Sequence, residues 1–204
     1  MSILGTRSKL RGFRSIRCAH CKLPGRQCLC SDFPNIESRA SFAVLIHSQE
    51  LQKPTSTGSL VVQCLRDSKL VVWDRVREKE LSRRFFSKAV APCVVFPKTS
   101  HQKGADIGKE DLAQIENPGF IYIDGTWRQA RRIYRQSRYL QSLPIISLSE
   151  IKRSHHRLRT SKLTDQLLTI EAVIATLDLI EEPDNASKLR GFFDQYSQTY
   201  IRFK

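Results

Sequence analysis

Residues 120–135 read Phe-Ile-Tyr-Ile-Asp-Gly-Thr-Trp-Arg-Gln-Ala-Arg-Arg-Ile-Tyr-Arg. An apolar run ends at Asp124, Gly125 permits a tight turn, and a helix is expected to follow. In open α/β sheets, ligands collect at the carboxyl ends of the strands, where helix N-termini also present free N–H groups. This strand–turn–helix unit therefore predicts an α/β fold with a binding site around residues 124–127.

The helix that follows the turn carries two kinds of side chain. Its apolar positions, from Trp127 to Tyr134, form one face, and arginines line the rest. The arginines are Arg128, Arg131, Arg132 and Arg135. One helix would thus join the strand-end site to a surface that binds phosphate groups.

Strand-like and helix-like segments on either side extend this unit into a complete domain. Strand-sized apolar segments occur at residues 41–47, 69–73, 92–96, 119–124 and 144–148. Each is continuously apolar rather than alternating, which favours a mainly parallel sheet with helices on both faces. Helical patterns occur at residues 57–66, 75–88, 127–139, 163–180 and 187–201. A short helix is also expected within the polar segment 98–118.

The chain has six cysteines, and four of them lie close together: Cys18, Cys21, Cys28 and Cys30. Two closely spaced pairs can converge on one tetrahedral zinc ion, and such a closed site stabilises a small knuckle. An iron–sulfur centre and two disulfides are the alternatives, although nothing in the sequence indicates an oxidising compartment. We expect a basic N-terminal segment with a zinc knuckle over residues 1–36 and a larger domain over residues 37–204.

Charge indicates the kind of partner. The 204 residues include 34 Lys and Arg against 20 Asp and Glu, which gives a formal net charge of +14. Basic residues cluster in residues 1–30, on the predicted helix 127–139 and in residues 152–159, as is typical of proteins that bind nucleic acid. We expect Arg14 and Arg17 to contact phosphates together with the helix arginines. Without a membrane-sized apolar run or a signal-peptide core, the sequence predicts a cytoplasmic protein with no membrane association and no obligate protein partner.

The stretch Asp124-Gly-Thr-Trp127 resembles the Asp-x-Thr-Trp signature of the DTW domain family. The four clustered cysteines resemble the family's zinc knuckle, and residues 95–97 resemble its Leu-Phe-Pro strand end. Residues 47–58 resemble its His-x2-Glu…Asn-Thr-Gly block, with Ser56 in place of Asn. Residues 158–172 resemble its Leu-Arg…Ser-Thr-x-Glu-Ala block, with Leu168 in place of Ser.

This family is similar to the SPOUT class of S-adenosylmethionine enzymes, which implies a C-terminal trefoil knot. Its members resemble tRNA-uridine aminocarboxypropyltransferases. The implied reaction moves the 3-amino-3-carboxypropyl group of S-adenosylmethionine onto N3 of a uridine in tRNA and releases methylthioadenosine. The implied catalytic residues are Asp124, Thr126 and Trp127. The implied contacts to S-adenosylmethionine are Phe96, Pro97, Asp124, Gly125, Thr126, Leu148, Leu158 and Arg159.

Several roles remain open at this point. Asp124 fits a general base, a ligand of the α-ammonium group of S-adenosylmethionine, or a helix cap. Thr126 fits a hydrogen-bond donor to the cofactor carboxylate or a cap, and Trp127 fits a stacking surface for a base or a core anchor. Two other functions suit the same residues: an RNA methyltransferase of the same fold, and a non-catalytic zinc-containing RNA-binding protein.

Overall fold

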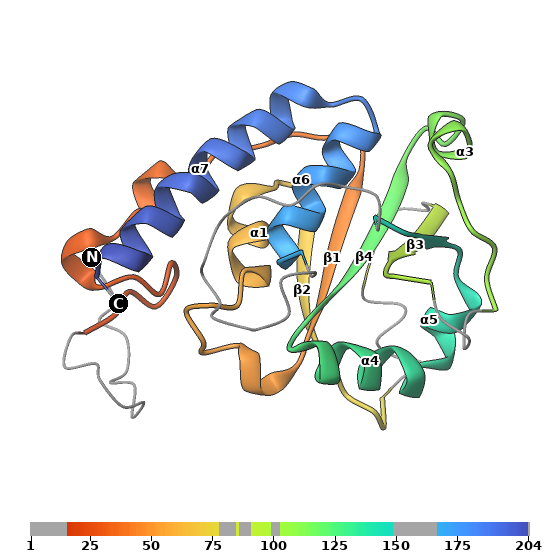
Figure 1. Ribbon diagram of the computed structural model, residues 1–204, viewed down its shortest axis with the longest axis horizontal. Coiled ribbons are helices and arrows are strands. Elements are labelled where there is room, and N and C mark those ends of the chain that lie inside the picture. The colour runs from red at the N-terminus through yellow and green to blue at the C-terminus, as the bar shows by residue number, and fades with distance from the viewer. Residues whose placement is uncertain (1–15, 78–84, 86–90, 99–102, 149–166, 204) are drawn as a thin grey trace.

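The computed structural model describes residues 16–77, 85, 91–98, 103–148 and 167–203. They form a five-stranded, wholly parallel sheet in the order β2-β1-β4-β3-β5 (Figure 1). The strands are β1 (Ser41–Ile46), β2 (Ser68–Val72), β3 (Ala91–Val95), β4 (Pro118–Asp124) and β5 (Ile145–Ile146). All five predicted strands are confirmed, because continuously apolar segments of this length suit strands that are covered on both faces.

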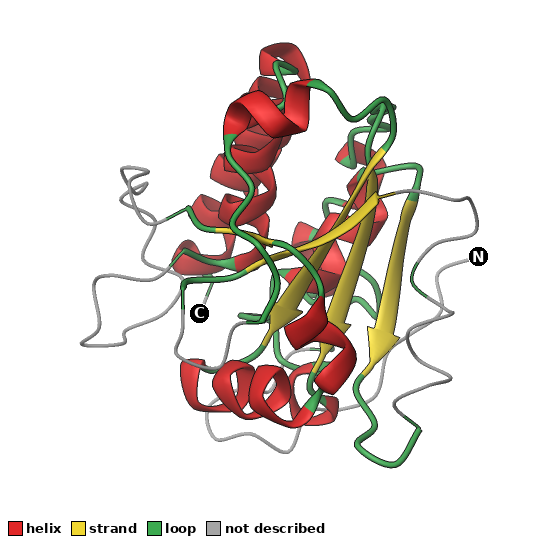
Figure 2. Ribbon diagram, turned by 90° about the vertical axis from the view of Figure 1, so that its right-hand side faces the viewer, coloured by secondary structure: helices red, strands yellow, loops and turns green. Residues whose placement is uncertain are grey.

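Helices cover both faces of the sheet, as predicted. The helices are α1 (Gly58–Cys64), α3 (Lys109–Ala113), α4 (Trp127–Gln136), α5 (Arg138–Ser142), α6 (Thr169–Leu179) and α7 (Pro183–Arg202). The core on one face joins the sheet to α1, α6 and α7, and the core on the other face joins it to α4 and α5. Along β4 the side chains alternate between them: Phe120 and Tyr122 enter the first core, and Ile121 enters the second. Figure 2 shows the strands running toward the end of the molecule at which α4 lies.

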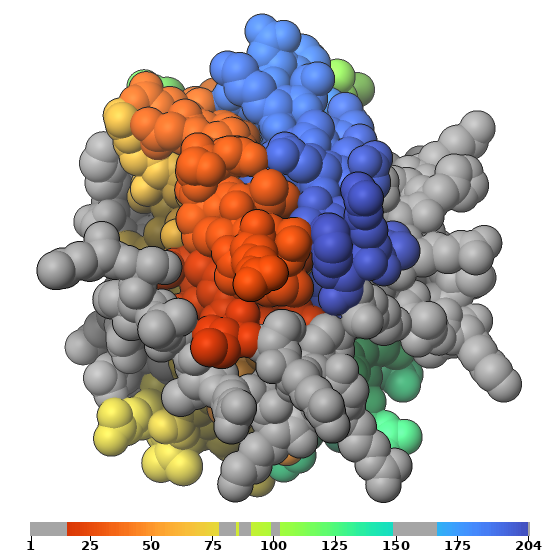
Figure 3. All heavy atoms as spheres, turned by 90° about the vertical axis from the view of Figure 1, so that its left-hand side faces the viewer, coloured from red at the N-terminus to blue at the C-terminus, as the bar shows by residue number. Residues whose placement is uncertain are grey.

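The N-terminal segment packs along α7. Pro183 occupies the first turn of this helix, where its missing N–H costs no hydrogen bond. The rings of Phe33 and Phe192 lie 5.1 Å apart between centroids, and Cys21 is fully buried in the same core. Figure 3 shows the N-terminal segment and α7 side by side on one face of the molecule. The division between residues 36 and 37 stays a prediction.

One predicted helix, over residues 127–139, is in fact two helices. Ser137 separates α4 from α5 because its backbone is extended, with φ −114° and ψ 93°. Its hydroxyl accepts a hydrogen bond from the indole N–H of Trp73 at 3.1 Å. The Gln141 side chain donates to the carbonyls of Tyr134 at 3.1 Å and Arg135 at 2.8 Å, which satisfies the end of α4. These tertiary contacts leave no mark in helical periodicity.

Some predictions fall outside the described residues. They include most of the helix predicted at 75–88, whose residues 75–77 are not helical, and the first part of the helix predicted at 163–180. Arg14, Leu158 and Arg159 also lie outside. The C-terminal knot depends on residues 149–166 and stays a prediction. None of the helices that the structure describes is both long enough and apolar enough to span a membrane.

Candidate functional site

Asp124 is the last residue of β4, and it is buried, with only 2% of its surface exposed. β4 lies between β1 and β3 in the middle of the sheet. The backbone carbonyl of Asp124 accepts a hydrogen bond from the N–H of His47 at 3.1 Å, so β1 and β4 stay paired to their ends. The topology therefore puts this carboxylate at the edge of the sheet where parallel α/β proteins bind their ligands.

Two hydroxyl groups hold the Asp124 carboxylate. Ser56, in the loop before α1, donates to Oδ2, and Thr169, the first residue of α6, donates to Oδ1 at 2.6 Å. The same two segments also meet directly, because the Thr57 hydroxyl accepts from the backbone N–H of Ile170 at 3.3 Å. Hydrogen bonds to a charged acceptor are stronger than those between neutral groups. One buried carboxylate thus ties together three segments that are far apart in the sequence.

Gly58 leaves room for this carboxylate. A Cβ atom at Gly58 would lie 2.9 Å from Oδ2 of Asp124 and 2.7 Å from Cγ1 of Val44. We expect Gly58→Ala to lower the free energy of unfolding by about 1–3 kcal/mol, because an added methyl group in a close-packed site forces its neighbours to move. Urea denaturation measures this difference.

The matched control is Gly191→Ala on α7. A Cβ atom at Gly191 would meet nothing within 4 Å. Alanine is favoured over glycine inside a helix, so this variant is expected to be about 0.5–1 kcal/mol more stable than the original protein. A Gly58→Ala variant as stable as Gly191→Ala would contradict the crowding at Asp124.

Thr126 caps α4, and Asp124 does not. The Thr126 hydroxyl accepts from the N–H of Gln129 at 3.3 Å, and Oε1 of Gln129 accepts from the N–H of Thr126 at 2.6 Å. This reciprocal pair is a capping box. Nε2 of Gln129 lies 3.2 Å from Oε1 of Gln49 and 3.4 Å from Nδ1 of His47, which joins α4 to the β1–α1 loop. Helix capping as the role of Asp124 is therefore wrong, while the same prediction for Thr126 is confirmed.

Trp127 lies on the α4 side of the sheet, away from the Asp124 carboxylate. Its ring stacks on Phe96, with centroids 5.3 Å apart and planes at 22°, and Phe96 in turn stacks on Tyr134 at 4.8 Å and 18°. The guanidinium of Arg131 lies 5.5 Å from the Trp127 ring centroid. Because the carboxylate instead contacts α1 and α6, a ligand that reached both residues would have to extend across the end of β4.

The other predicted contacts within the described residues lie at the same edge of the sheet. Phe96 and Pro97 follow β3 and Leu148 follows β5; Phe96 is buried, Pro97 exposed and Leu148 half-buried. Gly125 lies between Asp124 and the capped helix. A Cβ atom there would lie 3.1 Å from Cβ of Gln129, so the close approach of this side chain explains the glycine.

The arginine face of α4 is exposed, as its amphipathic pattern predicted. All four arginines, Arg128, Arg131, Arg132 and Arg135, are exposed, whereas Ala130, Ile133 and Tyr134 are buried. Arg17 differs from them, since it is 9% exposed and its Nη1 donates to the carbonyl of Lys22 at 2.7 Å. Because this guanidinium supports the N-terminal turn, Arg17 is not suited to the phosphate contact predicted from the sequence.

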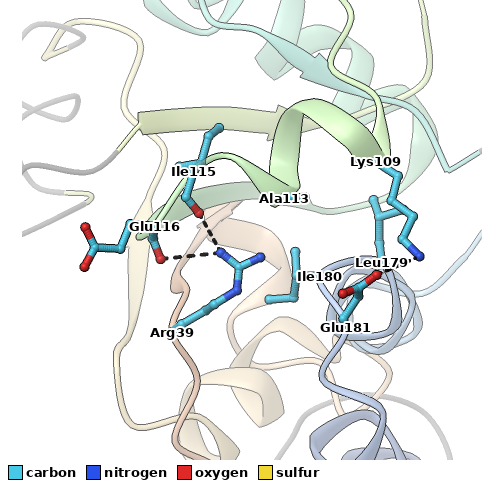
Figure 4. A pocket seen from close by; sticks show the side chains of 8 residues that line it. All are labelled: Arg39, Lys109, Ala113, Ile115, Glu116, Leu179, Ile180 and Glu181. Carbon is cyan, nitrogen blue, oxygen red and sulfur yellow. Dashed lines mark hydrogen bonds and ion pairs between the residues drawn. The ribbon is translucent and has the colours of Figure 1, made fainter.

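The described residues line a pocket of about 370 Å³ at the opposite end of the sheet (Figure 4). Arg39, which precedes β1, donates to the carbonyls of Ile115 at 2.6 Å and Glu116 at 3.4 Å. Lys109 and Glu181 form an ion pair of 3.1 Å across another part of the wall. Ligands of parallel sheets bind at the carboxyl ends of the strands, and this pocket faces the amino ends, so we do not assign the functional site to it.

The four clustered cysteines converge on one point, as predicted. Their Sγ atoms all lie within 4.8 Å of one another, with Cys18 and Cys30 3.5 Å apart and Cys21 and Cys28 3.8 Å apart. These are free thiols, because the sulfurs of a disulfide are only about 2 Å apart. Zn–S bonds of about 2.3 Å in a tetrahedron separate the sulfurs by about 3.8 Å. An iron–sulfur cluster divides its four thiolates among two or more irons, so that thiolates on different irons stand farther apart, and this set instead fits a single tetrahedral ion.

The backbone of the N-terminal segment prepares this cluster for a metal. A tight turn brings Cys21 back toward Cys18, with Lys22 in the left-handed region at φ 61° and the N–H of Lys22 donating to the Cys18 carbonyl at 3.1 Å. Burial by itself raises the pKa of Cys18, but hydrogen bonds from the backbone N–H groups of Cys21 and His20 outweigh it and lower this pKa to about 7. Burial raises the pKa of Cys30 and raises that of Cys21 to about 11, so a metal that binds all four thiolates must displace protons from these two thiols.

Sequence reasoning missed the role of Ser56 and Thr169 as partners of Asp124. Both residues lie in blocks that carry the family resemblance, and a hydroxyl residue near a glycine or at a helix N-terminus was the available signal. That signal predicts a local cap or turn equally well. The partnership of Ser56 and Thr169 with Asp124 exists only once β4, α1 and α6 have come together.

Comparison with known proteins extends these observations. The family model described as "DTW domain" matches residues 15–201. The chain is 23% identical over 180 residues to "tRNA-uridine aminocarboxypropyltransferase 2" of Macaca fascicularis, covering 83% of this chain and 58% of that protein. It is 25% identical over 177 residues to the protein of the same name in Drosophila melanogaster, covering 82% of this chain and 68% of that protein. No solved structure matches the chain significantly. Since the family model covers nearly the whole chain, the protein belongs to the DTW domain family.

Proposed function

We propose that this protein transfers the 3-amino-3-carboxypropyl group of S-adenosylmethionine to N3 of a uridine in tRNA. Membership in the DTW domain family and the names of the two relatives support the reaction and the substrate. The observation that carries the proposal is the position of Asp124, a buried carboxylate at the carboxyl end of the central strand. It lies beside a helix whose exposed face holds four arginines, as a tRNA substrate requires.

In this reaction Asp124 binds the α-ammonium group of S-adenosylmethionine. A general base must come within about 3 Å of the proton that it removes, and a uridine held in a polynucleotide is bulky. Asp124 is 2% exposed, and its carboxylate is held from two sides by Ser56 and Thr169. An ammonium group is small, carries three N–H donors and neutralises the buried charge, so it suits this carboxylate better than a nucleobase does.

The chemistry is one displacement at carbon. N3 of the uracil forms a bond to the terminal methylene of the amino-acid arm, and the C–S bond breaks. Its electron pair leaves with sulfur in methylthioadenosine, while the N3 proton passes to solvent. The sulfonium activates three carbons, so the bound pose decides which one reacts. Anchoring the arm at Asp124 directs its methylene, rather than the methyl group, toward the uridine.

Thr126 and Trp127 bind the two reactants: Thr126 binds the amino-acid arm of S-adenosylmethionine, and Trp127 binds the uracil. The Thr126 hydroxyl accepts from Gln129 and can still donate its own proton, which suits the carboxylate of the amino-acid arm. Trp127 is half-buried and its ring is backed by Phe96, so it suits stacking on the uracil ring when the exposed Arg131 guanidinium, which lies over the ring, turns to a phosphate of the tRNA. The two residues both follow the end of β4, across which the reacting groups must meet.

The test is product analysis with purified protein, tRNA and S-adenosylmethionine labelled in its aminocarboxypropyl carbons. Mass spectrometry of the tRNA nucleosides should find the label on uridine, with one methylthioadenosine released for each modified nucleoside. S-Adenosylhomocysteine and a methylated nucleoside would show a methyltransferase instead. Tight binding of tRNA without any binding of S-adenosylmethionine would show an RNA-binding protein that is not an enzyme.

The arginines of α4 supply the tRNA-binding surface. We expect Arg128→Ala, Arg132→Ala and Arg135→Ala each to weaken tRNA binding, because each variant removes a positive charge that neutralises a phosphate. The slope of log Kd against log salt concentration should fall by about one unit for each phosphate that the variant no longer binds. Fluorescence anisotropy at several salt concentrations measures both quantities.

The matched control for these variants is Arg190→Ala. Arg190 is an exposed arginine on α7 that pairs with Asp178 at 2.8 Å. It should leave tRNA binding unchanged, and the α4 variants should leave the affinity for S-adenosylmethionine unchanged. An equal loss of both affinities in the α4 variants would contradict a surface devoted to tRNA.

We also propose that the Cys18, Cys21, Cys28 and Cys30 cluster holds zinc with a structural role. Four protein thiolates fill a tetrahedral coordination sphere and leave no open position for a substrate. The ion would then cross-link the N-terminal segment in the geometry in which it packs against α7. This role accounts for a segment that has little apolar core of its own.

A further inference from the structure

The hydroxyl group of Tyr196 lies between the cysteine cluster and the Asp124 site. Tyr196 is on α7 and is fully buried, with no exposed surface. Its hydroxyl oxygen is 2.9 Å from the carbonyl of Cys21 and 3.0 Å from the carbonyl of Pro54. Cys21 is one of the four clustered cysteines, and Pro54 belongs to the loop between β1 and α1. One side chain therefore contacts two segments that the sequence keeps apart.

The β1–α1 loop is held together by its own hydrogen bonds, and its last part contacts the Asp124 side chain. Inside it, the N–H of Lys53 donates to the carbonyl of Glu50 at 3.0 Å, and the N–H of Ser56 donates to the carbonyl of Lys53 at 3.1 Å. Nζ of Lys53 also forms an ion pair of 2.7 Å with the buried Glu50. Ser56 comes two residues after Pro54 and donates to Asp124. A shift of Pro54 would thus be passed to the hydroxyl that holds the carboxylate.

We propose that Tyr196 is a positioning residue that couples the metal site to the Asp124 site. With the four thiols on one ion, the Cys21 carbonyl is fixed, and Tyr196 transfers that constraint to Pro54 and on to Ser56. The coupling predicts that the order of the loop depends on the metal. Its effect on S-adenosylmethionine affinity rests on the function proposed above, whereas its effect on the loop does not.

Hydrogen bonding gives this contact its strength. The hydroxyl has one proton, which it shares between the carbonyls of Cys21 and Pro54 in a three-centre hydrogen bond. A buried carbonyl that loses this donor has no water to replace it, and the penalty exceeds the net value of an ordinary hydrogen bond. Tyr196→Phe removes only the oxygen and keeps the ring, so the surrounding core stays packed. The variant therefore removes the hydrogen bonds of Tyr196 without changing the packing of α7.

Hydrogen exchange measured with and without metal tests the coupling. In the metal-loaded original protein, the amides of Lys53 and Ser56 should be protected, and removal of the metal by a chelator should speed their exchange by about tenfold. In Tyr196→Phe the exchange of these amides should already be about tenfold faster with metal bound, and chelation should add little. Equal effects of the chelator on both proteins, or unchanged exchange in Tyr196→Phe, would overturn the proposal.

Three controls separate the link from general loss of stability. The amide of Leu65, which donates to the carbonyl of Val61 at the end of α1 away from the loop, should exchange equally in all samples. Tyr122→Phe, which alters another fully buried tyrosine of the same core, should leave Lys53 and Ser56 protected. Cys28→Ser alters the exposed cysteine of the cluster, which leaves Tyr196 intact, and should speed exchange in the loop as chelation does. Protection of the loop in a Cys28→Ser protein that has lost its metal would overturn the proposal.

Calorimetry with S-adenosylmethionine supplies the functional readout. Tyr196→Phe should raise the Kd by about tenfold, the same factor as metal removal, and the two changes together should give no further loss. Fully additive losses would contradict coupling through this hydroxyl. If the original protein failed to bind S-adenosylmethionine at all, the proposed function would fail, while the exchange measurements would still decide the link.

Discussion

Asp124→Asn is expected to weaken the binding of S-adenosylmethionine by about a hundredfold, because it removes the charge that the α-ammonium group needs as a partner. Loss of one member of a buried charged pair costs about 2–5 kcal/mol in binding. Asparagine has the same shape, and its side-chain oxygen can still accept from Ser56 or Thr169, so the fold should persist. Calorimetry gives the affinity, and turnover at saturating S-adenosylmethionine gives kcat.

This measurement separates the two roles that remain for Asp124. A general base would leave the affinity for S-adenosylmethionine unchanged and would lower kcat by about 10²–10⁴-fold. An analogue of S-adenosylmethionine that lacks the α-amino group sharpens the test. The original protein should bind this analogue weakly. Asp124→Asn should bind the analogue with the same weak affinity as the original protein does. A further loss for the analogue in Asp124→Asn would contradict direct contact between the carboxylate and the ammonium group.

Two variants of Thr169 complete the argument. Thr169→Val keeps the shape and removes the hydroxyl that donates to Oδ1 of Asp124 at 2.6 Å. It should cost about tenfold in affinity, because the carboxylate loses one of the groups that orient it. Thr169→Ser restores the hydroxyl and should restore binding. Asp178→Asn, at an exposed aspartate of the same helix, should have no effect.

The sequence predicted the sheet well because each strand is defined by its own residues. Segments such as 119–124 are continuously apolar, and this pattern requires cover on both faces wherever the segment lies in the fold. The cysteine cluster could be predicted for a similar reason, since the spacing of the four cysteines alone brings them within reach of one ion. In both cases the physical cause lies within a few residues of the feature that it produces.

The partners of Asp124 could not be predicted in this way. Ser56, Thr169 and Asp124 are separated by long stretches of chain, and only the parallel pairing of β1 with β4 and the packing of α6 bring them together. The sequence also placed Asp124 and Trp127 in one cluster because they are neighbours in a short motif. In the structure the strand ends between them, so their side chains serve opposite faces of the sheet.

The distribution of charge along the sequence did not predict the position of Arg17, because that position also depends on how the chain folds. Arg17 lies in a basic stretch without any acidic residue, which predicts exposure. In the folded chain it is buried, and its guanidinium donates to the Lys22 carbonyl beside the cysteine cluster. The exposure of the four arginines of α4 was predicted correctly, because helical periodicity separates an apolar face from a charged one.

Cys21→Ser is expected to destabilise the protein more than any other single change to the cluster. Cys21 is the one member without any exposed surface, and it lies in the core shared with α7. Zinc binding to small zinc-finger peptides contributes about 10–16 kcal/mol, which is as large as the whole stability of a typical domain, about 5–15 kcal/mol. Even a third of that value would lower the Tm of a chain of this size by about 10 °C or more.

Calorimetric melting and elemental analysis of the purified protein test this expectation together. The original protein should carry one zinc per chain, and a chelator should lower its Tm to that of Cys21→Ser, which should itself not respond to the chelator. Cys64→Ala is the matched control, because Cys64 is a buried cysteine outside the cluster and burial raises its pKa to about 12, so that it stays a neutral thiol. It should keep the metal and the response to the chelator. A Cys21→Ser protein that retained one zinc per chain, or an original protein whose Tm ignored the chelator, would contradict a structural ion at this cluster.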